Sequence, residues 1–485
     1  MTLKLHNTLT KKIEPFAPLS SDKVTLYTCG PTVYNFPHVG NWAGYIFCDT
    51  LVRTLLANDY KIERVMNITD VGHLVSDEDE GEDKLQKGAH REGITAWEVA
   101  KFYTDDFLHG MKLLNMIEPE HISRATDFIE QQLALVRTLK NKGYTYQIDD
   151  GIYVDTSKFP TYADFAGLDL AAQRAGARVA FNEEKRNPSD FALWKFSSAD
   201  EHRDMEWDTP LDLLEDSEAK KGFPGWHLEC SAMAMSLLGP TIDIHTGGID
   251  HIPVHHTNEI AQSESASGQK FANMWLHNNH LKVDGTKISK SLGNGFTLQD
   301  LENRGFDPMD YRLLILQGHY SNEGNFTLDN LRAAKNRLKN WRNVAALRHQ
   351  THDTLKNDDE KSNIEEGVPL LAGSQAIVEA LNNNLDTPTA LKIVDGIFAQ
   401  LEAEDLMNVH QFGLNQFLET IDALLGLNLL KTTPDISDEV KRLILERQRA
   451  RSNNDWETSD KLRDELTKSH IGVRDTSRDT IWFYI

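Results

Sequence analysis

The chain has 485 residues, of which 40% are hydrophobic and 26% charged. We expect three or more domains, because a single hydrophobic core rarely organises so long a chain. The sequence contains no run of 18 or more apolar residues, and its first ten residues lack the apolar core of a signal peptide. The composition therefore argues against a membrane-spanning protein and predicts a cytoplasmic location.

Cysteine number and charge narrow the class further. Only three cysteines are present, Cys29, Cys48 and Cys230, which are too few for a disulfide framework. If any of them has a functional role, we expect that role to be metal binding. The formal net charge of −23 argues against nucleic-acid binding over a broad basic surface. Residues 436–485, however, hold 10 Lys and Arg against 10 Asp and Glu, which leaves room for a local RNA contact in the tail.

The first elements along the chain predict a parallel sheet. Residues 24–28 form a short β-rich run that ends in the turn signal Cys29-Gly30-Pro31. Residues 42–57 show helical spacing of aromatic and aliphatic side chains, and residues 61–68 alternate as a second strand. A strand, a helix and a strand within about 45 residues are typical of a βαβ unit.

The pattern changes between residues 119 and 222, which we interpret as an insertion. A helix is predicted over 126–142 and short strands near 151–155, while the acidic stretch 197–221 is predicted to be an exposed loop. Order resumes with a helix over 226–238, a buried strand over 241–245 and a helix over 257–266. Further helices are predicted over 329–344, 370–385, 421–430 and 440–453, with a charged linker over 351–367.

The segment Pro37-His38-Val39-Gly40-Asn41 stands between the first strand and the first helix. Free N–H groups at a helix N-terminus attract phosphate oxygens, Gly40 permits close approach of a nucleotide, and His38 can donate to a phosphate. Alone, a His-x-Gly at a helix start is more often purely structural.

A second segment, Lys287-Ile288-Ser289-Lys290-Ser291, places two lysines around a hydroxyl in a glycine-flanked loop. This composition suits a mobile clamp for phosphates, although such loops are usually just solvated.

A third, scattered set holds metal-ligand side chains. His255 and Glu259 are four residues apart and share one face of a helix, and thiolate, imidazole and carboxylate groups are all good zinc ligands. Spacing does not show that Cys29 and Cys230 converge with them, and His256 beside His255 leaves the ligand choice open.

Together and in this order, the motifs resemble those of cysteinyl-tRNA synthetases over essentially the whole chain. The resemblance rests on Tyr27-Thr28-Cys29-Gly30-Pro31-Thr32-Val33-Tyr34, His38-Val39-Gly40-Asn41, Asn67-Ile68-Thr69-Asp70, the runs 185–195 and 225–233, Asp243 to Asp250, His255-His256-Thr257-Asn258-Glu259, and Lys287 to Ser291. The sequence departs from the family pattern at Asn41, Ile288 and Thr246, and in the acidic stretch before Gly225.

The resemblance implies an α/β fold: a class I Rossmann-type parallel-sheet catalytic domain with an inserted connective domain, then a helical bundle and a small C-terminal anticodon-binding domain. The predicted boundaries are 1–118 and 223–275 for the two catalytic halves, 119–222 for the insertion, 276–320 for a stem-contact region, 321–430 for the bundle and 431–485 for the anticodon-binding domain.

The resemblance also implies an activity, namely ATP-dependent formation of cysteinyl-adenylate from L-cysteine and transfer to the 3′ end of the cysteine tRNA, by a monomer. One Zn²⁺ bound to the substrate thiol and Mg²⁺ accompanying ATP are the implied cofactors. The implied zinc ligands are Cys29, Cys230, His255 and Glu259, and Gly30, Thr69 and Trp226 would line the cysteine pocket. Trp226 is equally well explained as a core aromatic.

For the adenylation step, the resemblance implies catalytic roles for His38, Asn41, Lys287 and Lys290, and ATP contacts from His38, Gly40, Asp250 and Lys290. In the tail, the resemblance implies tRNA contacts by Arg451, Asp460 and Asp475, and Trp456 is a further candidate because its ring offers a flat face to a base. Arg447 and Arg449 can pair with phosphates and Trp482 offers a flat face, although a solvated helix face explains the arginines as well.

The sequence argues against three alternative functions. A ligase that passes activated cysteine to a sugar amine would share the catalytic motifs but lack the tail. A catalytically dead paralogue would have lost a lysine or a zinc ligand, and all are present. A dinucleotide-binding oxidoreductase would need a Gly-x-Gly-x-x-Gly turn after the first strand, where none stands.

Overall fold

A five-stranded parallel sheet forms the centre of the chain. The computed structural model describes residues 2–71, 84–168, 182–198, 203–216, 218–289, 292–350, 369–476 and 480–485. The sheet has the order β12-β11-β3-β4-β5, with every neighbouring pair parallel. Its strands are β3 (Val24–Thr28), β4 (Ile62–Ile68), β5 (His121–Arg124), β11 (Ile242–Gly248) and β12 (Ala272–Asn278). The order reverses between β3 and β11, and ligands of such sheets bind at the carboxyl ends of the strands beside that reversal.

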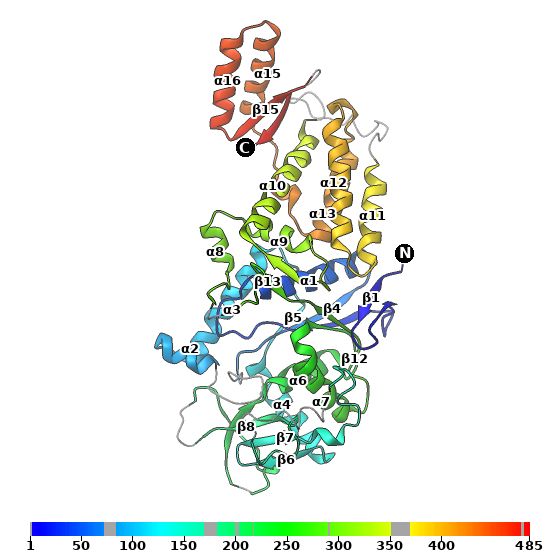
Figure 1. Cartoon of the computed structure of the whole chain (residues 1–485), viewed down its shortest axis with the longest axis vertical. Helices are drawn as coiled ribbons and strands as arrows, with labels where there is room; N and C mark the ends of the chain where they lie inside the picture. The colour runs from blue at the N-terminus through cyan, green and yellow to red at the C-terminus, as the bar shows by residue number, and fades with distance from the viewer. Residues whose placement is uncertain are drawn as a thin grey trace.

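Helices cover both faces of this sheet (Figure 1). They are α1 (Val39–Ala57), α3 (Ala96–Leu113), α6 (Trp226–Leu238) and α7 (Thr257–Ser267), while the short α2 (Lys84–Glu92) packs on α3. β3 is buried at all five positions, as expected for a central parallel strand covered on both faces. A hairpin of β1 (Lys4–Asn7) and β2 (Lys12–Pro15) lies along the edge strand β12.

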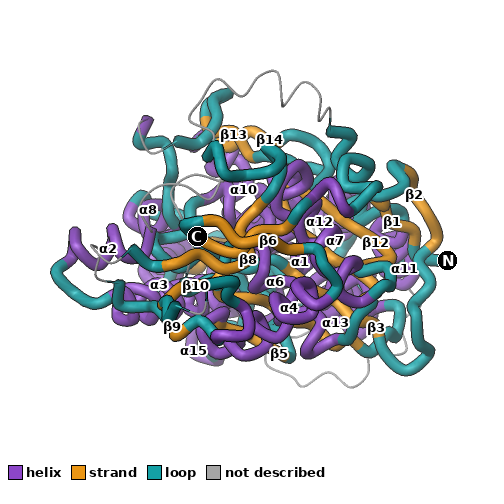
Figure 2. Tube along the Cα trace, turned by 90° about the horizontal axis from the view of Figure 1, so that it is seen from below, coloured by secondary structure: helices purple, strands orange, loops and turns teal. Residues whose placement is uncertain are grey.

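The insertion has a sheet and a core of its own. The sheet order is β6-β7-β8-β10-β9, and α4 (Ile129–Asn141) packs between it and α6 and α7. The strands are β6 (Thr145–Ile148), β7 (Gly151–Val154), β8 (Phe191–Phe196), β9 (Trp207–Asp208) and β10 (Lys221–Pro224). Figure 2, seen from below, shows β6, β8 and β10 side by side at that end of the molecule.

The prediction of an exposed loop over 197–221 is wrong in part, because some of its described residues are paired or buried. β9 pairs with β10, Met205 and Leu213 are buried, and the Trp194 indole N–H donates to Oγ1 of Thr209 at 2.9 Å. These contacts join segments distant in sequence, so the polar composition of the stretch gave no sign of them.

Beyond the sheet, the chain builds a helical bundle. β13 (Leu281–Val283) pairs in parallel with β14 (Gly324–Phe326), and α8 (Leu298–Asn303) and α9 (Pro308–Leu316) lie between them in sequence. The bundle consists of α10 (Leu328–Ala345), α11 (Leu370–Asn382), α12 (Thr387–Ala403), α13 (Gln411–Leu425) and the short α14 (Leu429–Thr432). The predicted charged linker 351–367 lies outside the described residues.

Buried charges join the bundle to α1 of the sheet domain. The Asp49 carboxylate on α1 accepts hydrogen bonds from Arg53 (2.7 Å) and from Arg312 on α9. Arg53 also donates to the carbonyls of Asp422 and Ala423, and Arg312 to that of Leu425, at the C-terminus of α13. Guanidinium groups are stabilised at the negative end of a helix, so this cluster fixes α13 against the helix whose first turn faces the candidate site.

The C-terminal domain consists of two helices and a hairpin at the far end of the bundle (Figure 1). Its elements are α15 (Asp438–Ser452), α16 (Trp456–Lys468), β15 (Ile471–Asp475) and β16 (Thr480–Tyr484). The Gln350 amide donates to the Trp482 carbonyl (3.0 Å) and accepts from the Trp482 N–H (2.8 Å), which anchors the hairpin next to the bundle. No helix within the described residues is both long and apolar enough to cross a bilayer.

Candidate functional site

Four side chains predicted as metal ligands converge at the carboxyl ends of β3 and β11. Cys29 follows β3, Cys230 lies on α6, and His255 and Glu259 lie on the helical stretch that begins at Ile252. Ligand atoms of Cys230, His255 and Glu259 all lie within 4.8 Å of one another, as do those of Cys29, His245, His256 and Glu259. The two groups share Glu259, so one compact cluster of sulfur, nitrogen and oxygen ligands is formed from four distant segments.

Neighbouring histidines hold this cluster in place. His227 Nδ1 lies 3.0 Å from His255 Nδ1, which leaves His255 Nε2 directed at Glu259 Oε1, 2.6 Å away. His245 Nε2 lies 2.7 Å from the other carboxylate oxygen, Oε2. Hydrogen bonds of this kind from outer residues fix the tautomer and orientation of metal ligands.

The donor set fits a divalent metal ion. His255 and Glu259 are fully or almost fully buried, and Oε1 of Glu259 receives no hydrogen bond of acceptable geometry despite its short contact with His255. His255 and Glu259 each have a ligand atom within 4.8 Å of the other and of the Cys230 thiol, so the three are close enough to bind one ion. Two sulfurs, one imidazole and one carboxylate are a typical ligand set for Zn²⁺.

The electrostatics of the cluster favour the anionic forms of two of its members, Glu259 and Cys29. Burial disfavours the Glu259 carboxylate, but His245 and His255 hold its pKa far below the usual range. The pKa of His255 is raised to about 10 because the attraction of Glu259 outweighs burial. A hydrogen bond from Cys230 lowers the pKa of the Cys29 thiol, whereas burial raises that of Cys230. The protein thus concentrates negative charge on Cys29 and Glu259, where a cation would be bound.

The predicted cysteine-pocket residues surround this cluster. The Gly30 N–H donates to the Asn67 side-chain oxygen at 2.8 Å, and a Cβ on Gly30 would lie 1.8 Å from the Asn67 carbonyl oxygen. The Thr69 hydroxyl donates to Glu229 at 2.9 Å. The Trp226 ring lies 4.5 Å from that of His255 and is half-buried, so it borders the cluster and is not a fully enclosed core residue.

Glu229 is a buried residue that sequence reasoning missed. Its Oε2 has no hydrogen-bond partner among the residues that the structure describes, and burial raises its pKa well above the usual value. The only available signal was its position inside the run 225–233, directly before Cys230. Sequence reasoning also missed four histidines that gather around His255 and His256, namely His227, His245, His251 and His277. Their spacing in the sequence does not show that they come together.

The first turn of α1 faces the same end of the sheet. His38 is its N-cap, and His38 and Asn41 form a capping box that satisfies two N–H groups. The Val39 N–H donates to the Phe296 carbonyl (2.8 Å), and the Tyr311 hydroxyl donates to the Val39 carbonyl. Burial lowers the pKa of His38, which keeps the ring neutral near pH 7.

The glycine-flanked lysine loop is adjacent to this turn. A Cβ on Gly40 would lie 2.9 Å from Cδ1 of Ile288, so Ile288 packs directly over the helix start. Asn294 holds the loop by accepting from the Ser289 N–H (2.9 Å) and donating to the Lys287 carbonyl (3.3 Å). Lys287 is exposed, and Lys290 lies outside the described residues. Asp250 is exposed just after β11, close to Gly248.

Two predictions for the tail are wrong. Trp482 is only 1% exposed and packs in the core of the C-terminal domain, so it offers no face to a base. Arg447 is equally buried and donates both of its terminal nitrogens to the Asp475 carboxylate, at 2.8 and 2.7 Å, so it is not available to phosphates. The helical spacing of Arg447, Arg449 and Arg451 did not show which of them turns inward.

The four predicted tRNA contacts gather only in part. Trp456 is 54% exposed, and the guanidinium of Arg451 lies 5.3 Å from the centre of its ring. Arg451 also lies 3.3 Å from Asp475, whereas Asp460 is exposed on α16. Arg451, Trp456 and Asp475 therefore form one surface group.

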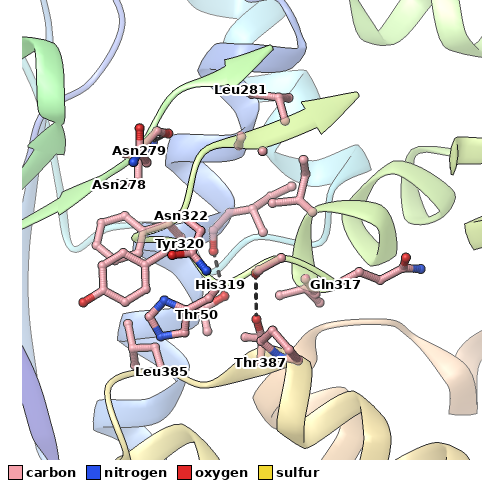
Figure 3. A pocket seen from close by; sticks show the side chains of 18 of the residues that line it. Thr50, Asn278, Asn279, Leu281, Gln317, His319, Tyr320, Asn322, Leu385 and Thr387 are labelled. Atoms are coloured by element: carbon pink, nitrogen blue, oxygen red, sulfur yellow. Dashed lines mark hydrogen bonds between the residues drawn. The ribbon is translucent and has the colours of Figure 1, made fainter. Parts of the chain in front are cut away.

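A separate cavity of about 390 Å³ lies between α1, the end of β12 and the bundle (Figure 3). Tyr320 stacks on Phe47 at 4.5 Å, and Asn278 and Gln317 line the same cavity. The described residues of its wall include no Lys or Arg, and no predicted site residue is among them. The cavity is thus unsuited to a triphosphate and distinct from the metal-ligand cluster.

Comparison with known proteins identifies the family. Residues 15–336 match the model of the tRNA synthetases class I (C) catalytic domain, and residues 433–482 match that of the cysteinyl-tRNA ligase anticodon binding domain. The chain is 42% identical to cysteine–tRNA ligase 1 of Burkholderia lata, over 98% of this chain and 96% of that protein. The chain belongs to the cysteine–tRNA ligase family. A second member, from Treponema denticola, is 38% identical over 99% of both chains.

Solved structures support the class I fold. Methionyl-tRNA synthetase of Mycobacterium tuberculosis in complex with methionyl-adenylate superposes with a TM-score of 0.58 at 15% identity, covering 84% of this chain and 93% of that one. The parallel-sheet core and the C-terminal domain expected for a cysteine–tRNA ligase are confirmed. The match over 433–482 also argues against the tail-less ligase that would use a sugar amine.

Proposed function

We propose that this cysteine–tRNA ligase activates L-cysteine with ATP at the carboxyl end of the β3–β11 sheet and transfers it to the cysteine tRNA. The single observation that supports this most directly is the cluster in which Glu259 joins the pair Cys230 and His255 to Cys29, at the end of the sheet where α1 begins. A set of thiolate ligands next to a phosphate-binding helix start matches a substrate that has both a thiol and a carboxylate to be activated.

We propose that the four residues hold one Zn²⁺. When bound, the ion supplies a Lewis acid that favours the thiolate of cysteine over the hydroxyl of serine. His227 contacts His255 and His245 contacts Glu259, so the two histidines would orient these ligands when the ion is bound. Binding to a hydrophobic pocket alone distinguishes such similar side chains by only about 1–3 kcal/mol, so a metal-based preference makes hydrolytic editing unnecessary.

The remaining pocket residues orient the amino acid. The Gly30 position admits no side chain, because Asn67 closes that space, and the Trp226 ring forms a wall beside His255. Thr69 and the buried Glu229 form a hydrogen-bonded pair near the ligand cluster. These residues place the cysteine carboxylate toward the start of α1.

Adenylation requires charge stabilisation more than proton transfer, because the carboxylate displaces pyrophosphate directly from the α-phosphorus. His38, Gly40 and Asn41 present the N-terminus of α1 to the phosphates, and Lys287 and Lys290 neutralise the leaving pyrophosphate. Mg²⁺ accompanying ATP would add to this neutralisation. Asp250, beyond β11, binds the adenosine end. Ile288, packed over Gly40, closes the lysine loop onto this turn.

In the second step the tRNA reacts with the adenylate, and we propose that the C-terminal domain recognises the cysteine tRNA. The half-buried Arg451 and the exposed Trp456 form a cation and aromatic pair suited to a base, and Asp475 and Asp460 offer acceptors to base edges. The monomeric state and the cytoplasmic location stay predictions.

Charging of purified cysteine tRNA with labelled cysteine tests the proposed function, with serine as the matched amino acid. We expect cysteine to be charged and serine to be rejected both in pyrophosphate exchange and in charging. Equal exchange with serine would contradict the role of the thiolate ligands, and exchange without charging would point to an acceptor other than tRNA.

A further inference from the structure

An exposed aromatic cluster stands beside the start of α1. Phe36, two residues before His38, is 41% exposed, and Phe102 on α3 is 53% exposed. Their ring centres are 5.9 Å apart, and both rings pack edge-on against Tyr103, which is buried, at 5.0 and 5.1 Å. Tyr103 thus fixes two large apolar rings on the surface, and neither belongs to the site described above.

The cluster lies where the catalytic domain meets the insertion. The N-terminus of α3 is tied to the insertion, because the Ala96 N–H donates to the Asp204 carboxylate (2.8 Å) and the Trp97 indole donates to the Asp204 carbonyl (3.1 Å). Trp97 also packs edge-on against Trp207 of β9 at 6.4 Å. At its other end α3 packs on α1, since the Gly110 position abuts the Trp42 ring. Figure 1 shows α3 on the same side of the molecule as α8 and α2.

We propose that Phe36 and Phe102 form a stacking platform for the unpaired 3′ end of the tRNA. The inference rests on the proposed function, in which that end must reach the adenylate next to His38. Two residues of extended chain span about 7 Å, so a nucleotide stacked on Phe36 is a near neighbour of the reacting one. Unpaired bases of RNA are commonly held by stacking on aromatic side chains, whatever their identity.

The charges around the cluster favour contact with base faces over contact with phosphates. Lys101, which precedes Phe102, is paired with Asp105 at 2.5 Å, and Asp106 follows on the same helix. The described residues of α3 include more acidic than basic side chains: the acidic ones are Glu98, Asp105 and Asp106, and the lysines are Lys101 and Lys112. A site for the phosphate backbone would need unpaired cations, whereas stacking needs only the exposed rings.

The variant Phe102→Leu tests the platform, with Phe102→Tyr as the matched control that keeps the ring face. We expect Phe102→Leu to lower kcat/KM for tRNA charging about tenfold or more, the usual effect of one lost base stack. Cysteine-dependent pyrophosphate exchange should stay within about twofold, and Phe102→Tyr should charge like the wild type. The loss should be the same at low and moderate salt, because no phosphate contact is removed.

A tRNA lacking its last three nucleotides locates the contact. We expect the wild type to bind the intact tRNA more tightly than the shortened one, and this difference to be clearly smaller in Phe102→Leu, which retains only the Phe36 ring. A parallel fall of exchange and charging would overturn the proposal, because Phe102 would then only support the segment before His38. Unchanged charging, or a binding loss that persists with the shortened tRNA, would also overturn it and assign the patch to another tRNA region or to a protein partner. Failure of the wild type in exchange would instead refute the proposed function.

Discussion

His38 and Asn41 each hydrogen-bond the backbone of the other at the start of α1. The Asn41 side-chain oxygen accepts from the His38 N–H at 3.0 Å, and Nδ1 of His38 accepts from the Asn41 N–H at 3.3 Å. One residue pair thereby caps the helix and leaves the Asn41 NH₂ and the His38 Nε2 directed away from these bonds. The asparagine, which departs from the family's usual histidine, therefore has a structural role besides the proposed contact with ATP.

The two roles of Asn41 can be separated by substitution. Asn41→Asp keeps the oxygen that caps the His38 N–H and adds a negative charge that suits a helix N-terminus. Asn41→Ala removes the cap and should lower the free energy of unfolding by about 1 kcal/mol. We expect Asn41→Asp to be at least as stable as the wild type in urea unfolding, yet to lose about 100-fold in pyrophosphate exchange, because the carboxylate repels the phosphates. Full exchange activity in Asn41→Asp would remove Asn41 from the phosphate site.

Removal of a metal ligand should have a specific effect. We expect Cys230→Ser to fall from about one zinc per chain to nearly none and to lose cysteine activation, because a hydroxyl is a poor replacement for a thiolate ligand. Metal content is measured on the purified protein by mass spectrometry of the element, alongside cysteine-dependent exchange.

Cys48→Ser is the matched control. Cys48 is also buried, and its sulfur lies 3.3 Å from the Thr246 hydroxyl, a contact that serine preserves. This variant should retain both zinc and activity. Full zinc retention in Cys230→Ser would show that the ligand set is wrong.

Local pattern predicted the elements of the catalytic core well, but not their meeting points. The strand at 24–28 and the helix at 226–238 were predicted to the residue, because each is a regular apolar run closed by a turn signal. Cys29 and Cys230, in contrast, are brought together because α6 packs against the sheet over β3. The spacing of the two cysteines in the sequence does not encode this packing. Their convergence was accessible only through the family resemblance.

The errors have the same physical origin. The short strand β9 is stabilised by pairing with β10 and by Trp194, both distant in sequence, so its own polar composition misled the prediction. Arg447 is buried because Asp475, on β15, neutralises it. A guanidinium group is buried only where a carboxylate partner is available, and the partner of Arg447 lies in a different secondary-structure element.

The Gly30 position offers a steric test of the cysteine pocket. A Cβ there would meet the Asn67 carbonyl at 1.8 Å, so Gly30→Ala must displace β4 or the turn after β3. We expect the variant to lose cysteine activation and stability together, as measured by pyrophosphate exchange and urea unfolding. Gly396 in the middle of α12 is the control, since nothing lies within 4 Å of a Cβ at that position. Gly396→Ala should be about 1 kcal/mol more stable and fully active. An active Gly30→Ala would show that this turn has more freedom than its contacts imply.

The Arg447–Asp475 pair predicts how acid affects the C-terminal domain. Hydrogen bonds from Arg447 hold the pKa of Asp475 at about 2, below the value of about 3.9 expected in the unfolded chain. The unfolded state therefore binds more protons at mildly acidic pH, so the stabilisation is complete well above pH 4 and is lost as pH falls toward 2. In Asp475→Asn this contribution is absent at every pH. We expect the stability difference between wild type and Asp475→Asn, measured by urea unfolding, to be largest above pH 5 and to shrink steadily down to pH 3. A difference that stays constant over this range would mean that the carboxylate charge does not stabilise the buried guanidinium of Arg447.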